Sequence, residues 1–368
     1  MSDRYGDSTR AVKAVSSQPN PGEPVGPGPV LASAFHLSDD EGSEAYTYGR
    51  SANPTWRQLE SALADLEGAT AALSFGSGMA AITAALRVTA KPGSVLVVPA
   101  DGYYQVRRYA TESLAPLGIT VREVGAEQIY AAAEDADVVL AETPTNPALD
   151  VVDLHRLAQI CRRRGARLLV DNTTATPLGQ QPLSLGADLV VASATKALAG
   201  HSDLLAGYVA GSHPELMAAL ERERLLSGAI LGSFEAWLVL RSLGSVGLRF
   251  ERQCQNALAL ATAVTGHPNV RSVRYPGLPD DPSYPVASAQ MRRFGGLVSL
   301  ELSDEAAVHA LVGRSELLVA ATSFGGIHTS VDRRARWGDP VPDGFARISA
   351  GIEDTDDLVA DVLAALDG

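Results

Sequence analysis

The chain has few cysteines and no long apolar run, and each shortage excludes a class of protein. Only Cys161 and Cys254 occur among 368 residues, and they lie far apart without the spacing of a metal site or a redox pair. A disulfide framework and a cysteine-held metal are therefore not expected. No apolar stretch is long enough to cross a bilayer, and the polar start MSDRYGDSTRAVKAV lacks the apolar middle of a signal peptide. We expect a cytoplasmic protein without a membrane partner.

Basic charge is also scarce. The chain has 30 Lys and Arg against 43 Asp and Glu, a formal net charge of −13. The basic clusters are short: Arg162 to Arg164 fit the last turn of a helix, and Arg333, Arg334 and Arg336 lie in a predicted loop. An acidic protein without a basic track is not expected to bind nucleic acid.

Proline and glycine are concentrated in residues 18–29, QPNPGEPVGPGP, which cannot form a regular element. We therefore expect residues 1–45 to form an N-terminal arm. Such an arm could wrap a partner subunit, although composition alone does not establish this.

Strands and helices alternate over residues 46–245. The predicted strands are Ser94 to Pro99, Ile119 to Val124, Asp137 to Glu142, Arg167 to Asn172, Asp188 to Ser193 and Gly207 to Gly211. The clearest helix is Leu154 to Arg164, with Asp153 as its cap and Gly165 as its end. Continuous apolar strands that alternate with helices predict an α/β domain with a mostly parallel sheet covered on both faces.

Two further helices are predicted at the start of this domain. Thr55 and Gln58 have capping-box spacing, and Gly68 can end the helix that follows. Gly76 to Gly78 open another helix, whose free amide groups could hold a phosphate. The stretch has neither G-x-G-x-x-G nor a P-loop lysine. A non-catalytic nucleotide-binding protein is therefore the less favoured alternative.

The pattern changes after residue 245. A long helix is predicted from about Leu248 to Thr265, strands within residues 295–302, 316–322 and 345–351, and a closing helix from Thr355 to Leu366. We expect residues 246–368 to form a smaller α+β domain.

Polar side chains follow three of the predicted strands. They are Glu142 and Asn146 after one strand, Asp171, Asn172 and Thr173 after another, and Ser193, Thr195 and Lys196 after a third. Ligands collect at the carboxyl ends of parallel strands, so one site is expected there. A lysine at an apolar strand end can form a Schiff base with a carbonyl, and an aspartate there can pair with a protonated pyridine nitrogen. Alone, Lys196 would be read as solvated and Asp171 as a turn residue, but together they favour pyridoxal phosphate.

The chain resembles the Cys/Met-metabolism group of pyridoxal-phosphate enzymes from about Tyr46 to its C-terminus. The matching segments, in family order, are YGRSANPT, SFGSGMAAI, ADGYY, ETPTNP, VDNTTATPLGQ, LGADLVVASATKALAGHSD and RISAGIED. The resemblance implies the fold type I of pyridoxal-phosphate-dependent transferases and a homo-oligomer, expected as a tetramer made of two active dimers.

The resemblance also implies roles for single residues. Lys196 would be the Schiff-base lysine, and Asp171 would pair with the pyridine nitrogen. The other implied roles are Gly78, Met79, Ser193 and Thr195 at the phosphate, Thr173 at the cofactor, Tyr48 and Arg50 at the phosphate of a neighbouring subunit, Tyr103 stacked on the ring, Asn146 near the ring and the substrate, Arg347 on the substrate α-carboxylate, and Thr322 and Ser323 at the substrate.

Departures from the family pattern leave the substrate open. Gln105 lies in a stretch where the family commonly continues with Gly-Gly-Thr, and Thr322 stands where several γ-lyases and γ-synthases carry an acidic residue. The cysteine typical of methionine γ-lyases is missing, and the segment after Ser323 is shorter than usual. The resemblance implies a lyase that converts cystathionine or a related sulfur amino acid to cysteine, 2-oxobutanoate and ammonia. The alternatives are γ-replacement on an activated homoserine and a role in secondary metabolism.

Overall fold

A seven-stranded sheet forms the centre of the larger part of the molecule. The computed structural model describes residues 5–16, 20–39 and 44–368. The sheet has the order β1-β7-β6-β5-β4-β2-β3. Its strands are β1 (Ala71–Phe75), β2 (Val95–Pro99), β3 (Thr120–Val124), β4 (Val138–Glu142), β5 (Arg167–Asp171), β6 (Leu189–Ala192) and β7 (Gly207–Gly211). Strand β7 pairs antiparallel with both β1 and β6, and all other pairings are parallel, so the predicted mostly parallel sheet is confirmed.

Twelve α-helices are present among the described residues. They are α1 (Asp7–Ala14), α2 (Pro54–Glu67), α3 (Gly78–Thr89), α4 (Tyr104–Tyr109), α5 (Ile129–Ala133), α6 (Leu154–Arg164), α7 (Thr176–Gly179), α8 (Pro214–Ser227), α9 (Ser233–Val264), α10 (Tyr284–Gln290), α11 (Glu305–Arg314) and α12 (Thr355–Asp367). No described helix is both long and apolar enough to span a membrane.

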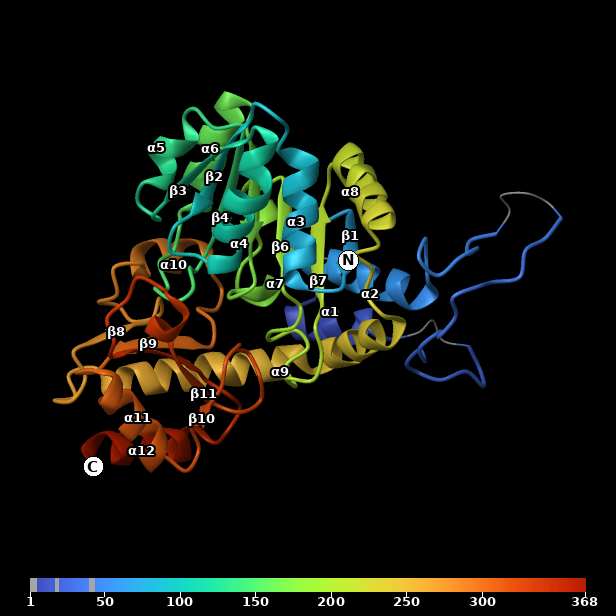
Figure 1. Cartoon of the computed structure of the whole chain (residues 1–368). Helices are drawn as coiled ribbons and strands as arrows, with labels where there is room; N and C mark the ends of the chain where they lie inside the picture. The colour runs from blue at the N-terminus through green and yellow to red at the C-terminus, as the bar shows by residue number, and fades with distance from the viewer. Residues whose placement is uncertain (1–4, 17–19, 40–43) are drawn as a thin grey trace.

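Side chains of the central strands alternate between two apolar layers. Leu169 packs with the α3 and α8 side, whereas its neighbours Leu168 and Val170 pack with the α5 and α6 side. Successive residues of a strand point to opposite faces, so a strand buried on both faces must be apolar at every position. This is why the apolar runs in the sequence predict the strands so closely (Figure 1).

Strand β1 is an element that the sequence analysis did not predict. Its residues run directly into the glycine-rich start of α3, and the segment shows only a turn and a helix start by pattern. It joins the edge of the sheet by antiparallel pairing with β7. The pairing partner lies more than a hundred residues later in the chain, which local pattern cannot supply.

A second, smaller sheet follows α9. Its order is β10-β11-β12-β9-β8, and its strands are β8 (Ser272–Arg274), β9 (Leu297–Glu301), β10 (Val319–Ala320), β11 (Ser330–Arg333) and β12 (Phe345–Ser349). The sheet packs on α12 and on the C-terminal part of α9. The predictions for β9, β10, β12 and α12 are confirmed, while β8 and β11 were not predicted.

The long helix α9 differs from its predicted bounds. It begins at Ser233, fifteen residues before the predicted start at Leu248, and ends at Val264. The predicted boundary at 245/246 therefore falls inside a continuous helix. Figure 1 shows α9 running beneath the large sheet to the second sheet, so that it contributes to the cores of both.

Glycines inside α9 caused the wrong bound. The apolar pattern changes after Gly244, and a second glycine, Gly247, follows just before the predicted start. In the structure a β-carbon on Gly247 would lie 2.8 Å from Ser8 Cβ, and one on Gly244 would lie 3.1 Å from Val15. These positions are small because α1 packs directly on α9. The predicted arm thus contains a helix, α1, in addition to irregular chain.

The start of α2 also corrects a prediction. Its cap is Asn53, whose side chain accepts a hydrogen bond from Thr55 N, and Pro54 is the first helical residue. Thr55 is not the cap: its hydroxyl accepts a hydrogen bond from Val30 N instead. A tertiary contact to the arm therefore uses the group that the sequence pattern assigned to the helix.

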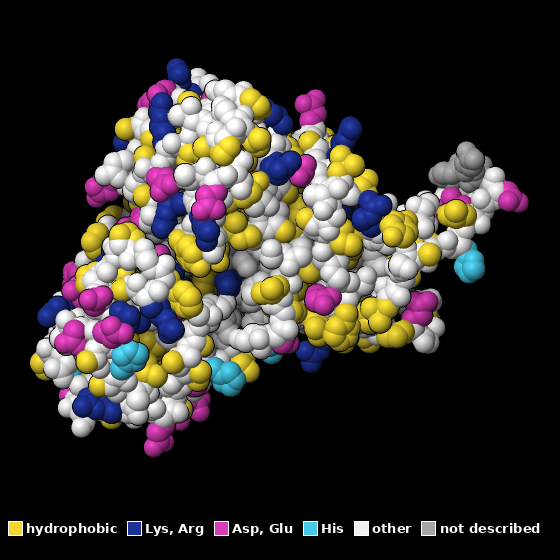
Figure 2. Space-filling view, in the orientation of Figure 1, with side chains coloured by type: hydrophobic (Ala, Val, Ile, Leu, Met, Phe, Trp, Pro, Cys, Tyr) yellow, Lys and Arg dark blue, Asp and Glu magenta, His cyan; other side chains and the backbone are white. Residues whose placement is uncertain are grey.

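After α1, the described residues 20–39 of the arm project away from the two sheets (Figure 1). Its described part bridges Ala34 with Tyr48 and packs the rings of Phe35 and Tyr46 at 5.5 Å. The predicted Pro/Gly-rich segment 18–29 is described from residue 20 onward; residues 1–4, 17–19 and 40–43 lie outside the described part. On the face shown in Figure 2, acidic and basic side chains are interspersed, with no continuous basic track.

We predict that Gly247→Ala destabilises the protein by more than about 1 kcal/mol, because the new methyl group forces α1 off α9. The matched control is Gly313→Ala in α11, where a β-carbon meets nothing within 4 Å. That change should stabilise by about 0.5–1 kcal/mol through helix propensity. Thermal unfolding of the cofactor-loaded proteins measures both, and equal midpoints for the two variants would contradict the packing argument.

Candidate active site

A cavity of about 480 Å³ lies at the carboxyl ends of the central strands. Most of the residues predicted for the site line it: Gly78, Met79, Tyr103, Asn146, Asp171, Thr173, Ser193, Thr195, Lys196, Thr322, Ser323 and Arg347. They come from both parts of the chain, since Thr322, Ser323 and Arg347 belong to the second sheet and its loops. The fold therefore gathers in one place residues that are as far apart in the sequence as Gly78 and Arg347, which are 269 positions apart.

Lys196 is held at both ends of its side chain. It follows β6 in a turn fixed by Thr195, whose hydroxyl both accepts from Ala206 N at 2.9 Å and donates to Ala206 O at 3.1 Å. At the other end, Lys196 Nζ donates a 2.7 Å hydrogen bond to Ser323 Oγ. Burial, followed by the nearby positive charge of Arg347, lowers the pKa of Lys196 to about 8. A substantial neutral fraction, which is the nucleophilic form, is thus available near neutral pH.

Arg249 on α9 supports the turn behind Lys196. Its guanidinium donates to the carbonyl oxygens of Ala197 at 2.7 Å, Leu198 at 3.1 Å and Ser242 at 2.8 Å. Any β-carbon on Gly200 would overlap this guanidinium, so the glycine in the GHSD segment is required by close approach. Arg249 acts through the backbone and is a positioning residue.

Asp171 and Glu142 form a buried pair of carboxyl groups on adjacent strands, where they are register partners. Burial raises the pKa of each, and their mutual repulsion raises the pKa of Glu142 further. Asp171 is the better stabilised anion, because its Oδ1 accepts from Thr173 N at 3.0 Å and Thr173 Oγ1 at 2.5 Å, and because Lys196 is near. We therefore assign the negative charge to Asp171 and a proton to Glu142, whose pKa is raised well above its ordinary value.

The N-terminus of α3 forms a narrow backbone cradle beside Lys196. Ser77 caps the helix by accepting a hydrogen bond from Ala80 N at 3.1 Å. A β-carbon on Gly78 would lie 2.6 Å from Ser193 Cβ, so only glycine lets α3 approach the end of β6 this closely. Gly78, Met79 and Ser193 all line the cavity. Helix N-termini favour phosphate, so this end of the cavity suits the phosphate of pyridoxal phosphate.

Arg347 is nearly fully buried, at 2% exposure. Nη1 donates to Asn146 Oδ1 at 2.6 Å, and Nη2 donates to Ser323 O at 2.7 Å. Nε, in contrast, is buried and has no hydrogen-bond partner among the described residues. Burial is the main cause that lowers the pKa of Arg347 to about 10, so the group still carries its charge at neutral pH. A buried cation with an unused donor suits a carboxylate ligand.

Two predicted residues lie outside this cavity. Tyr48 is 49% exposed on the loop before α2, and Arg50 Nη1 donates to Leu225 O at 3.1 Å. The Arg50 guanidinium also lies 5.4 Å from the centre of the Tyr48 ring. A single chain thus does not bring them to Lys196, and their role in a neighbouring subunit remains a prediction.

The cavity also contains residues to which the sequence analysis gave no role. They include Ile82, Tyr104, Leu205, Phe324, Arg334 and Trp337. Arg334 was counted only as part of a short basic cluster in a loop. Asp332 could have identified it. This aspartate lies two residues before Arg334, and it is the register partner of the predicted substrate-binding residue Arg347 across β11 and β12.

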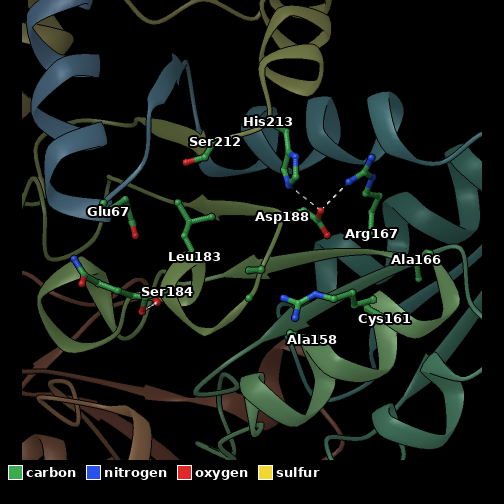
Figure 3. Close-up of a pocket in the computed structure, with 16 residues that line it drawn as sticks. Glu67, Ala158, Cys161, Ala166, Arg167, Leu183, Ser184, Asp188, Ser212 and His213 are labelled. Atoms are coloured by element: carbon green, nitrogen blue, oxygen red, sulfur yellow. Dashed lines mark hydrogen bonds and ion pairs between the residues drawn. The ribbon is translucent and has the colours of Figure 1, made fainter.

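A second cavity, of about 670 Å³, lies at the opposite edge of the sheet (Figure 3). Asp188 is paired there with Arg167 at 2.8 Å and with His213 at 3.1 Å, and its other oxygen accepts from Leu168 N. This second cavity has no lysine among its lining residues. It lies at the amino ends of β5 and β6, whereas ligands of such sheets bind at the carboxyl ends of the strands. The cavity with Lys196 is therefore the candidate active site.

Comparisons with known proteins agree with this geometry. Residues 8–367 match the family described as Cys/Met metabolism PLP-dependent enzyme. A Streptomyces coelicolor protein, named provisionally as a cystathionine γ-lyase, is 48% identical over 98% of this chain and 94% of its own length. The cystathionine γ-synthase of Mycobacterium tuberculosis is 36% identical over 98% of this chain and 97% of its own. The solved structure of a cystathionine γ-lyase from Micromonospora echinospora has a TM-score of 0.91 at 35% identity, and covers 99% of this chain and 100% of the other.

The lowered pKa of Lys196 predicts how the protein captures its cofactor. When cofactor-free protein is mixed with pyridoxal phosphate, the capture rate should rise with pH and level off above about pH 8, because the neutral amine reacts; an exposed lysine would continue to rise toward 10.5. Borohydride trapping followed by peptide mass analysis measures the rate at Lys196. The exposed Lys91 is the internal control and should stay unmodified. Cofactor mass on another lysine, or an inflection near pH 10, would contradict the prediction.

Proposed function

The chain belongs to the Cys/Met-metabolism family of pyridoxal-phosphate-dependent enzymes, and from this premise we propose that it is a carbon–sulfur lyase of the cystathionine γ-lyase type. In this reaction cystathionine and water give cysteine, 2-oxobutanoate and ammonia. The observation that supports the proposal best is the double use of Ser323. Its hydroxyl holds the amine of Lys196 and its carbonyl holds Arg347, each at 2.7 Å. A proton-carrying amine is thereby fixed beside a group that can hold the substrate carboxylate.

The residues of the cavity fit the cofactor. Lys196 would hold it through the amine, Asp171 would pair with its ring nitrogen, and the start of α3 would hold its phosphate. When bound, pyridoxal phosphate supplies an electron-accepting ring that stabilises negative charge at the substrate α-carbon. Asp171 favours a protonated ring nitrogen because it is the charged member of a buried carboxyl pair.

Lys196 is the proton carrier in this proposal. Its pKa of about 8 lets the amine accept a proton from the substrate and release it again near neutral pH. The hydrogen bond to Ser323 Oγ fixes one position of the amine within the cavity. Elimination requires protons to leave carbon and one to reach the departing sulfur, so a single mobile amine beside both centres is well suited to it.

Arg347 orients the substrate. Asn146 and Ser323 fix its guanidinium plane from two sides, and its buried Nε is the donor without a partner among the described residues. The charged guanidinium would pair with the α-carboxylate. A substrate held there has its α-carbon within the same cavity as Lys196. Orientation of this kind converts binding energy into a correct approach of the reacting groups.

A second candidate activity is γ-replacement on an activated homoserine, as in a cystathionine γ-synthase. The 36% identity to the Mycobacterium tuberculosis γ-synthase over nearly the whole chain favours keeping it. The two activities share the cofactor, Lys196 and Arg347, and they differ in whether water or a thiol completes the reaction. In either case we also propose a homo-oligomer, in which Tyr48 and Arg50 on the loop before α2 reach the site of a neighbouring subunit.

Product analysis separates the two activities. With cystathionine alone, the purified protein should release cysteine and 2-oxobutanoate in equal amounts, because water completes the elimination. Lys196→Ala should lower this rate by about a thousandfold or more, since the proton carrier is lost. Faster formation of cystathionine from O-acylhomoserine plus cysteine would instead assign the replacement activity, and no turnover in either assay would reject the proposal.

Variants of Arg347 test its role in carboxylate binding. Arg347→Ala should raise KM by about a hundredfold while the protein keeps its bound cofactor, because a charge-assisted contact to the substrate is removed. Arg347→Lys should recover part of the loss, since it restores the charge without the forked geometry. The control is Arg271→Ala, at a mostly exposed arginine outside the cavity. An unchanged KM in Arg347→Ala would show that the carboxylate binds elsewhere.

A further inference from the structure

The end of β11 and the segment after it form a compact cluster of four residues, Asp332, Arg334, Trp337 and Asp339, here termed the Asp332 cluster, in which all but Trp337 are buried. Asp332 Oδ1 accepts a hydrogen bond from Trp337 Nε1 at 2.9 Å, and its Oδ2 accepts one from Arg334 Nη1 at 2.7 Å. Arg334 also contacts Asp339 Oδ2 through Nε at 2.8 Å and Nη2 at 2.6 Å. The short helix Arg334–Trp337 is thereby fixed against β11.

The positive charge of Arg334 is neutralised within this cluster. Its single positive charge faces two carboxylates, and Arg334, Asp332 and Asp339 are all buried. Asp332 also contacts Arg347 Nη2 at 3.4 Å, so the two arginines and two aspartates carry no net charge together. Buried charges are stable only in such paired sets. Arg334 therefore braces the segment and is not available as a receptor for an added anion.

Trp337 presents an aromatic wall at the mouth of the active-site cavity. It lines the same cavity as Lys196 and Arg347, yet it is 37% exposed, whereas Arg347 is 2% exposed. Its indole is fixed by the hydrogen bond to Asp332. A substrate anchored at Arg347 deep in the cavity would therefore direct its far end toward Trp337. The exposed Leu205 also lines the cavity and adds apolar surface.

The described residues that line the cavity offer no carboxylate for a distal ammonium group. The lining carboxyl groups are Asp171 and Glu142, which sit at the ends of β5 and β4 and share the cofactor side of the site. Thr322, also in the lining, is neutral. A charged group at the far end of the substrate would leave water without a matched partner, which costs free energy.

We propose that Trp337, held by Asp332, determines specificity for the group beyond the γ-sulfur and favours homocysteine thioethers with an uncharged alkyl group. Cystathionine, whose distal end carries an ammonium and a carboxylate, is then the weaker substrate. Aromatic rings make favourable contacts with thioether sulfur and with alkyl groups, and burial of the alkyl group adds to them. The inference rests on the proposed lyase function and specifies the substrate class of the same site.

Three amino acids with six-carbon chains and no γ-leaving group test the role of Trp337 without requiring turnover. Norleucine ends in a methyl group, lysine in an ammonium and 2-aminoadipate in a carboxylate. Calorimetric titration of the cofactor-loaded enzyme gives their dissociation constants. We expect norleucine to bind at least about tenfold more tightly than either charged probe, from burial of its terminal carbons against Trp337. In the enzyme assay, kcat/KM should likewise be higher for S-ethylhomocysteine than for cystathionine.

Variants assign the preference to the indole. Trp337→Ala should weaken norleucine binding about tenfold and leave lysine and 2-aminoadipate nearly unchanged. Trp337→Phe, which keeps the ring without the hydrogen bond to Asp332, should retain most of the preference. Arg336→Ala is the local control, because Arg336 lies on the same short helix, its guanidinium lies 5.1 Å from the centre of the Trp337 ring, and it does not line the cavity. It should leave the norleucine constant unchanged.

Tighter binding of lysine or 2-aminoadipate than of norleucine in the wild-type enzyme would overturn the proposal. Tighter binding of 2-aminoadipate would indicate that Arg334 receives the distal carboxylate. An unchanged preference in Trp337→Ala would overturn it as well. These outcomes are distinct from failure of the proposed function, which is read from 2-oxobutanoate. Faster release of 2-oxobutanoate from cystathionine than from S-ethylhomocysteine would support the lyase function and contradict the proposed preference for alkyl thioethers.

Discussion

The candidate site depends on the joint contact of Ser323 with Lys196 and Arg347. Ser323 adopts φ 72°, in the left-handed region that a residue with a β-carbon seldom occupies. This conformation directs the hydroxyl toward the lysine of the large sheet and the carbonyl toward the arginine of the small sheet. The strain is tolerated because both contacts are charge-assisted hydrogen bonds. The two parts of the chain are thus connected at the place where the chemistry is proposed.

Burial sets the protonation states around this contact. It lowers the pKa of Lys196 and raises the pKa of Glu142 and Asp171, and each shift moves the group toward its neutral form. Asp171 resists because Thr173 donates two hydrogen bonds to it. The same low-polarity surroundings require the Asp332 cluster to be internally neutral. One physical constraint therefore accounts for a reactive lysine, a retained carboxylate and a braced aromatic wall.

Long helices and tight contacts show where local sequence patterns fail. The change of pattern at Gly244 delayed the predicted start of α9, but Gly244 and Gly247 lie inside that helix and are small because α1 packs against it. Thr55 looks like a cap, but its hydroxyl binds the arm and Asn53 is the cap. No sequence pattern indicated a role for Trp337, because its orientation depends on the hydrogen bond to Asp332. In each case the deciding partner is distant in sequence, and local propensity carries no information about it.

The sequence by itself determined the buried strands β2 and β4 to β7, the helix at Leu154–Arg164, the strand ends that carry Asp171 and Lys196, and, through its motifs, the enzyme family and cofactor. These features are local: an apolar run must be buried, and a reactive side chain keeps its place at the end of that run. Only the tertiary structure decided that Arg347 lies beside Ser323 and Asn146, that Tyr48 and Arg50 lie outside their own chain's cavity, and that Trp337 walls its mouth. Those positions follow from the packing of two sheets around α9, which no single segment encodes.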